Sequence, residues 1–364
     1  MISSITIQNF RCFKNLELKQ LKRITLIVGA NNSGKTSLLE ALFLLLGASN
    51  PDISLRLNAW RGVQQFASNW EETWGWLFYV RQTAAIIDLS AHTETGFEQG
   101  LTIKLTPPRE FEVSVRGQNE LPLGSGKESS EASKPMKFGV ELSDLVFEYH
   151  DSNGQKVTTR AMFTPDGSIR VEQGKIAGLR KTIFLHTHAR NFKENAQQFS
   201  KLKASGRDKQ VVEVLQNVER RLKGLDILVI GSEPVVHADV GMGTPVPLPM
   251  MGEGFNRIFA IVLAIANLSE GILLIDEIEN GLHVSALEKL WNAVHEMAVK
   301  TDVQIVATTH SLECVRAAVA AAGAKNREEI CVQRTQAING SIEAVALMQD
   351  TLAYALENNL EIRK

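Results

Sequence analysis

One stretch of the sequence, "IVGANNSGKTSLLEAL" at residues 27–42, constrains the fold more than any other. Residues 29–36 fit the pattern G-x-x-x-x-G-K-[ST] at every defined position. The preceding residues 24–28, Ile-Thr-Leu-Ile-Val, predict a strand, and residues 36–46, rich in Leu, Ala and Glu, predict a helix. Because a strand, a glycine-rich loop and a helix in this order form a phosphate-binding loop, we prefer that interpretation to a chance glycine-rich turn.

The motif gives each of its parts a chemical role. Backbone N–H groups of the loop close around phosphates, the Lys35 ammonium reaches the outer phosphates, and the Thr36 hydroxyl ligates Mg²⁺ at the start of the helix. The predicted nucleotide-binding residues of the loop are Gly29, Asn31, Asn32, Ser33, Gly34, Lys35, Thr36 and Ser37.

A second motif supplies the other anchor that a magnesium site beside such a loop needs. Residues 272–275, Ile-Leu-Leu-Ile, predict a buried strand that leads into Asp276 and Glu277. We expect Asp276 to hold Mg²⁺ through water, and Glu277 to orient or deprotonate an attacking water. The alternative is two ordinary acidic residues at a strand end. With the glycine-rich loop present, the doublet favours hydrolysis over phosphoryl transfer to a second substrate.

Two further segments are weaker candidates. "MGEGFNR" at 251–257 precedes an all-apolar stretch at 258–268 that predicts a buried helix, and its glycines would let the backbone approach an anion. From the residues alone, an ordinary glycine-containing helix start is the better interpretation. His310, in "ATTHS", follows a predicted strand at 303–307, where sheets of this kind bind ligands. It is a candidate γ-phosphate sensor, although a lone histidine there is usually packed or solvated.

The rest of the chain predicts one α/β domain with two insertions. Apolar strands that alternate with helices after residue 270 indicate a parallel sheet with helices on both faces, and Asn339-Gly340 predicts a hairpin turn. We expect a single domain over 1–364, with a nucleotide-binding lobe at 1–50 and 226–364. The first insertion is an antiparallel β region at 80–175, which contains a flexible loop at 117–135. The second is a helical insert at 186–225.

The order of the Gly-Lys-Thr, Gly-Glu-Gly, Asp-Glu and His motifs resembles the ABC-type ATPase heads of the RecF, SMC and OLD (overcoming lysogenisation defect) class. Such heads are often labelled AAA ATPases in bacterial defence loci. "ITIQNFRCFKNLEL" followed by "ITLIVGANNSGKTSLLEAL" is similar to the start of that class. The resemblance implies an ABC-type P-loop NTPase fold that binds ATP with Mg²⁺ and hydrolyses it to ADP and phosphate.

By the same resemblance, residues in the turn from Arg11 to Phe13 approach the adenine base, so Arg11 and Phe13 join the predicted nucleotide contacts. "TIFLHTHARN" at 182–191 falls where the class has its Q-loop. Because no glutamine is present there, Thr187 or His188 replaces the contact of that glutamine with the γ-phosphate and the metal.

Gly252, Glu253 and Gly254 resemble a degenerate signature motif, with Gly252 where transporter ATPases carry a serine. In this class the signature of one chain caps the ATP that the P-loop of a second chain holds. The resemblance therefore implies a head-to-tail homodimer or a higher homo-oligomer, with a two-fold, self-complementary interface.

OLD nucleases follow this head with a TOPRIM nuclease domain. Here 54 residues follow His310, and they predict a hairpin and a helix, so we expect no nuclease domain there. The resemblance therefore implies an effector, a nuclease or toxin, on a separate chain, as in the PARIS-like and Septu-like pairs of anti-phage defence. The alternatives are a RecF- or SMC-like DNA repair or maintenance ATPase, a P-loop kinase, and a transporter subunit, which the long insert and the lack of a signature serine oppose.

Composition limits the location and the partners. Lys and Arg total 39 against 41 Asp and Glu, so a net charge of −2 predicts no general affinity for polyanions. Residues 175–209 are locally basic, which leaves both a DNA or RNA contact and a solvated helical face open. Three scattered cysteines and the lack of a signal peptide or a membrane-spanning apolar run predict a cytoplasmic protein with no membrane contact.

Overall fold

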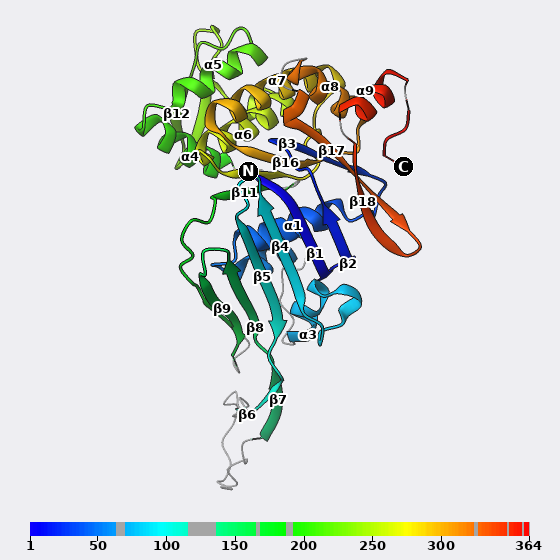
Figure 1. The fold of residues 1–364 in the computed structure, drawn as a ribbon. Coiled ribbons are helices and arrows are strands. Elements are labelled where there is room, and N and C mark those ends of the chain that lie inside the picture. Colours follow the sequence, from blue (N-terminus) through cyan, green and yellow to red (C-terminus); the bar gives the residue numbers. More distant parts are fainter. Residues whose placement is uncertain are drawn as a thin grey trace, which may run out of the picture.

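The computed structural model describes residues 1–62, 70–115, 136–164, 168–186, 192–323, 327–347, 349–358 and 360–363. Two large sheets and the helices between and beside them form the body of the molecule (Figure 1). Buried apolar side chains gather in two clusters, one on each face of the sheet that carries the glycine-rich loop.

That sheet has six strands. In spatial order they are β11 (Thr182–Leu185), β15 (Ile272–Ile275), β16 (Gln304–Thr308), β3 (Ile24–Gly29), β17 (Ile330–Ile338) and β18 (Ser341–Leu347). The first five are parallel, and β18 returns antiparallel to β17. Asn339 and Gly340 connect β17 to β18 with φ of 49° and 80°, which two-residue hairpin turns of this hand require, so the predicted hairpin is confirmed.

Both faces of this sheet are covered, which explains why its inner strand β15 is apolar at every position. In β15, Leu273 and Ile275 point into one cluster, whereas Ile272 and Leu274 point into the other. Because side chains alternate along a strand, a strand covered on both faces cannot show a polar side.

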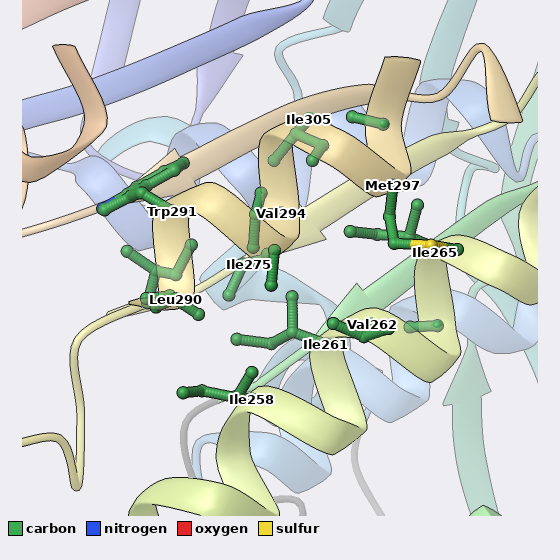
Figure 2. Close-up of a cluster of buried hydrophobic side chains, with 14 of the residues drawn as sticks. Ile258, Ile261, Val262, Ile265, Ile275, Leu290, Trp291, Val294, Met297 and Ile305 are labelled. Carbon is green, nitrogen blue, oxygen red and sulfur yellow. The ribbon is translucent and has the colours of Figure 1, made fainter. Parts of the chain in front are cut away.

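Three long helices cover the face of the sheet to which Leu273 and Ile275 point: α6 (Glu253–Leu268), α7 (Val284–Thr301) and α8 (Leu312–Ala322). Figure 2 shows Ile261 of α6 facing Val294 of α7, with Ile275 of β15 and Ile305 of β16 beside them. Trp291 of α7 is fully buried here, and its indole N–H donates to the Cys314 sulfur at 3.3 Å. This packing fixes the strand ends from which Asp276 and Glu277 project.

Helix α1 (Lys35–Leu46) covers the other face and is itself covered by a seven-stranded antiparallel sheet. The strands of that sheet are, in spatial order, β10 (Ile169–Glu172), β9 (Lys156–Phe163), β8 (Leu145–Asp151), β5 (Glu98–Leu105), β4 (Ile87–Thr93), β1 (Ile2–Phe10) and β2 (Phe13–Leu18).

This topology corrects two predicted boundaries. The antiparallel region predicted at 80–175 pairs with the N-terminus through β1 and β4, so residues 2–18 belong to it and not to the nucleotide-binding sheet. Similarly, the lobe predicted from 226 onward starts with a separate three-stranded sheet of β12 (Gly224–Ile230), β13 (Glu233–Asp239) and β14 (Val246–Pro247). Strand patterns in a sequence reveal the strands but not their partners, which causes both errors.

The remaining elements lie at the periphery. Strands β6 (Arg109–Val115) and β7 (Met136–Leu142) form a two-stranded ribbon that extends from the body (Figure 1). The loop predicted at 117–135 lies outside the described residues. The other helices are α2 (Asp52–Trp60), α3 (Trp70–Trp74), α4 (Phe192–Ala204), α5 (Asp208–Val218) and α9 (Gln349–Glu357). Among the described helices, none is both long and apolar enough to cross a membrane.

Candidate nucleotide site

The glycine-rich loop connects β3 to α1, and two of its glycines cannot be replaced without a clash. Gly34 has φ of 83° and ψ of 8°, and a Cβ there would lie 2.6 Å from the Phe13 ring. A Cβ on Gly29 would lie 2.4 Å from the carbonyl oxygen of Thr335 on β17. The Thr335 hydroxyl lies 2.8 Å from the Ser33 hydroxyl, so β17 supports the loop from below. The loop therefore has the conformation that its glycines permit.

Lys35 turns back onto this loop. Its ammonium donates to the carbonyl oxygens of Gly29 and Ala30, both at 2.8 Å. Only 6 % of the residue is exposed, and burial lowers the pKa of Lys35, while the carboxylates of Asp276 and Glu277 oppose the shift. The Lys35 ammonium therefore lies where the loop leads into the first turn of helix α1, whose free N–H groups favour anions.

Asp276 receives two hydroxyl groups from separate elements. The Thr36 hydroxyl lies 3.1 Å from both carboxylate oxygens, and the Thr308 hydroxyl at the end of β16 donates to Oδ1 at 2.7 Å. We call Lys35, Thr36, Asp276 and Thr308 the phosphate cluster. Mg²⁺ prefers oxygen ligands and is usually held by one or two carboxylates together with substrate phosphates, so the Thr36 hydroxyl and the Asp276 carboxylate fit this ion.

Glu277 and His310 approach each other beside the cluster, with Glu277 Oε1 and His310 Nε2 3.7 Å apart. Glu277 has φ of 46°, a conformation that costs free energy for a residue with a side chain. The Glu277 N–H donates to the Thr308 hydroxyl at 2.8 Å, and Arg257 of α6 donates to the carbonyls of Asp276 and Glu277, both at 3.2 Å. These bonds hold the strained turn and direct the Glu277 side chain toward His310.

The backbone of His310 is held on both sides. Its N–H donates to Glu279 Oε1 at 2.7 Å, and its carbonyl oxygen accepts from Arg363 at 2.8 Å. A histidine whose peptide groups are both bonded to side chains is fixed at the end of β16. The structure therefore brings the Asp-Glu doublet, which follows β15, close to the predicted histidine, which follows β16 in the same sheet.

One cavity of about 610 Å³ joins these groups. Its lining consists of Cys12, Asn31, Asn32, Ser33, Gly34, Lys35, Thr36, Ser37, Arg61, Glu277 and His310. Most of the predicted loop residues and both predicted catalytic residues therefore face one space.

Arg11 and Phe13, predicted as adenine contacts, do not face this cavity. Phe13 is fully buried under Gly34, and the Arg11 guanidinium forms an ion pair with Glu40, with an Nε–Oε2 distance of 3.0 Å. From the turn that contains them, Cys12 reaches the lining instead. The adenine contact of Arg11 and Phe13 stays a prediction, and the large apolar ring of Phe13 takes the inward position beneath Gly34.

Arg61, which the sequence did not single out, lines the cavity. It follows the last residue of α2, 40 % of its side chain is exposed, and its guanidinium bonds Glu40 and the Ser37 hydroxyl. No motif surrounds Arg61; its only local signal is a basic residue before Gly62, at the end of a helix. Its place in the site arises from the packing of α2 beside α1.

The predicted signature residues lie elsewhere. We call residues 250–254 the signature segment. Gly252 and Glu253 are exposed at the start of α6, and Gly252 has φ of 90°. A Cβ on Gly281 would lie 2.6 Å from Glu253 Oε1, so the segment lies against the turn that precedes α7. Two large apolar side chains are exposed here, Met250 at 76 % and Val284 at 58 %.

Two predictions remain without further support. Thr187 and His188, the predicted Q-loop substitutes, lie outside the described residues. In the basic stretch at 175–209, Lys193 pairs with Glu233 and Lys203 with Asp226, so acidic residues beyond the stretch offset part of its charge. The nucleic-acid contact stays a prediction.

Two family models match this chain. Residues 108–316 match a family model described as "AAA domain, putative AbiEii toxin, Type IV TA system", and residues 1–106 match an "AAA ATPase domain". The chain is 23% identical over 347 residues to an "ATP/GTP phosphatase" of Helicobacter pylori, and the match covers 86% of each chain.

The chain is also 26% identical over 349 residues to an "OLD nuclease" of Thermus scotoductus; this match covers 85% of the chain but 59% of the nuclease, so the chain spans less than two thirds of that relative. A "DNA replication and repair protein RecF" of Nitrosococcus oceani is 47% identical over 55 residues, 15% of each chain.

A solved structure shares the fold. It is described as "Crystal structure of the SmcHead bound to the C-winged helix domain of ScpA", with a TM-score of 0.51 and 12% identity over 96% of this chain and 98% of that one. The predicted fold class and the predicted resemblance to RecF, SMC and OLD heads are thereby confirmed.

Proposed function

Because this chain belongs to the AAA domain family and is an ATPase of the RecF, SMC and OLD type, we propose that it binds ATP with Mg²⁺ and hydrolyses it to ADP and phosphate. One observation supports the proposal most directly. The glycine-rich loop, Glu277 and His310 come from three separate segments and line a single cavity, with Asp276 bonded to Thr36 at its edge.

Each residue has a task in this proposal. The loop N–H groups and Lys35 bind the phosphates, and Arg61 adds a second cation at the rim. Thr36 and Asp276 hold Mg²⁺, which neutralises phosphate charge when bound. Glu277 orients the attacking water and accepts its proton. His310, 3.7 Å from Glu277, donates to the γ-phosphate oxygens, so both residues act at the same phosphorus.

A second copy of the chain completes the site in this proposal. The signature segment does not line the cavity of its own chain, and Gly252 and Glu253 are exposed. In a head-to-tail pair, the exposed backbone at the start of α6 would reach the γ-phosphate held by the other chain. Exposed Met250 and Val284 on the same side supply apolar area for such an interface.

The first test is the molar mass of Glu277→Gln protein, measured by light scattering with and without ATP and Mg²⁺. We expect a rise from monomer to dimer with ATP, because this variant binds ATP without hydrolysing it. Phosphate release by the parental protein, measured in parallel, tests hydrolysis. A parental protein that releases no phosphate contradicts the enzymatic proposal, whereas an ATP-independent mass contradicts the pairing alone.

We propose further that the ATPase controls a separate effector, a nuclease or toxin, in a prokaryotic anti-phage defence system. Two findings support this role: the similarity to an OLD nuclease and the toxin named in the description of the matching family. Cells that carry the native locus should lower phage plating only when Glu277 is intact. Equal protection by Glu277→Gln would argue against a role for hydrolysis in defence.

A DNA repair or maintenance ATPase is the second candidate. The short stretch shared with RecF at 47% identity favours it. Under this alternative, double-stranded DNA should stimulate phosphate release and the locus should affect survival after DNA damage. Stimulation by DNA without any effect on phage plating would favour this candidate over defence.

A further inference from the structure

Beneath the rim of the nucleotide cavity, two arginines share one buried carboxylate. Glu40 lies on α1, one turn after Thr36, and is 2 % exposed. Arg61 bonds it through two parallel contacts, Nε to Oε1 at 2.7 Å and Nη2 to Oε2 at 3.0 Å. Arg11 approaches Oε2 from the other side at 3.0 Å. The group carries two positive charges and one negative charge.

The three residues differ in their access to the cavity. Arg61 lines it, whereas Arg11 is buried and its guanidinium also donates to the carbonyl oxygen of Trp76 at 3.3 Å. A buried carboxylate is costly unless it is paired, and Arg11 gives Glu40 a second cationic partner besides Arg61. Although burial alone would lower it, the hydrogen bonds and charge of Glu40 raise the pKa of Arg61.

The direction in which Arg61 points is set by this pairing. A two-contact bond to a carboxylate fixes the plane of a guanidinium as well as its position. The remaining contact of Arg61, Nη2 to the Ser37 hydroxyl at 3.1 Å, links it to the first turn of α1, next to the phosphate-binding loop. Without Glu40, Arg61 would be a long side chain on a helix end with many accessible rotamers.

We propose that Glu40 is a positioning residue for nucleotide binding: it holds the Arg61 guanidinium against the cavity, while Arg11 keeps Glu40 paired from below. The excess positive charge of the group is directed toward the space where phosphate charge binds. This inference rests on the proposed ATP site and adds to it a residue that does not itself line the cavity.

The test is a double-mutant cycle on the affinity for a fluorescent ATP analogue, N-methylanthraniloyl-ATP, with Mg²⁺. We expect Arg61→Gln and Glu40→Gln each to weaken binding by about tenfold, the cost of a charge-assisted contact. The double variant should bind no more weakly than either single variant, because Glu40 acts through Arg61. Arg56→Gln, an exposed arginine on the same helix paired with Asp52, serves as the matched control and should bind normally.

A purely structural role for Glu40 would lower thermal stability without this non-additivity. If Glu40→Gln does not fold, Glu40→Asp keeps the charge that Arg11 needs and should still weaken binding, because a shorter side chain withdraws from Arg61. Parental affinity in a folded Glu40 variant overturns the inference, and so do losses that multiply to about a hundredfold in the double variant. If folded parental protein fails to bind the analogue, the proposed ATP site itself is wrong.

Discussion

The phosphate cluster and the signature segment are built in opposite ways. Lys35, Asp276 and Thr308 are buried, and each makes hydrogen bonds to neighbours in the same chain. Met250, Gly252 and Glu253 of the signature segment are exposed, and beyond its chain neighbours no described atom would lie within 4 Å of a Cβ on Gly252. One half of the proposed site is thus pre-organised by the fold of one chain. The other half is presented at the surface, where a second molecule can contact it.

The largest expected effects concern the general base, Glu277, and Lys35 of the phosphate cluster. Glu277→Gln should lower kcat by about 10³-fold, within the range of a lost general base, and leave ATP affinity intact. Lys35→Ala should weaken ATP affinity by about a hundredfold, because several charge-assisted contacts are lost. Phosphate-release kinetics and equilibrium binding separate the two. Parental turnover by Glu277→Gln would contradict the assignment of Glu277.

A substitution in the signature segment tests the comparison directly. Gly252→Ala should lower phosphate release by about tenfold, because the new methyl group would lie in the interface with a second chain. Gly243→Ala is the control for a side chain at positive φ: Gly243 has φ of 84° and equally open surroundings, and a left-handed backbone costs a residue with a side chain about 1–2 kcal/mol. If the two variants release phosphate at the same rate, Gly252 has no role in hydrolysis and the prediction is wrong.

A smaller effect is expected at Thr308, which positions other residues and does not line the cavity. Thr308→Val removes the hydroxyl that bonds Asp276 and accepts from the Glu277 N–H, so we expect kcat to fall by about fivefold with little change in ATP affinity. Thr25→Val in the neighbouring strand removes a buried hydroxyl that bonds the Lys22 backbone. Thr25→Val should lower thermal stability without changing kcat. If Thr25→Val lowers kcat as much as Thr308→Val does, the effect at Thr308 is structural and not positional.

The smallest effect is a labelling pattern. Cys12 lines the cavity, whereas Cys314 and Cys331 are buried, and burial raises the pKa of Cys314 to about 12 and that of Cys331 to about 11. Burial also raises the pKa of Cys12, so alkylation should be slow at pH 8 and speed up as the pH rises. Mass spectrometry after iodoacetamide treatment should find Cys12 alone modified, and ATP with Mg²⁺ should protect it. Unchanged labelling with ATP would place the nucleotide away from Cys12.

Much of the site could be predicted because its parts are local. The glycine pattern of residues 29–36 specifies a backbone conformation within eight residues, and Asp276 and Glu277 follow the apolar strand that positions them. His310 could be placed at the same sheet edge since the ends of parallel strands meet there. Arg61 and Glu40 could not be recognised as a pair, because 20 residues and a helix boundary separate them and no pattern joins them.

The sequence by itself determined the elements and their order: the phosphate-binding loop, the two-sided parallel strands, the Asp-Glu doublet and the hairpin at Asn339-Gly340. These follow from local backbone preferences and from side-chain periodicity. Only the tertiary structure decided which strands pair, that Phe13 lies under Gly34 while Cys12 faces the cavity, and that Glu40 joins Arg11 to Arg61. Such contacts depend on how α1 and α2 pack between the sheets, and the free energy of that packing is shared among residues far apart in the chain.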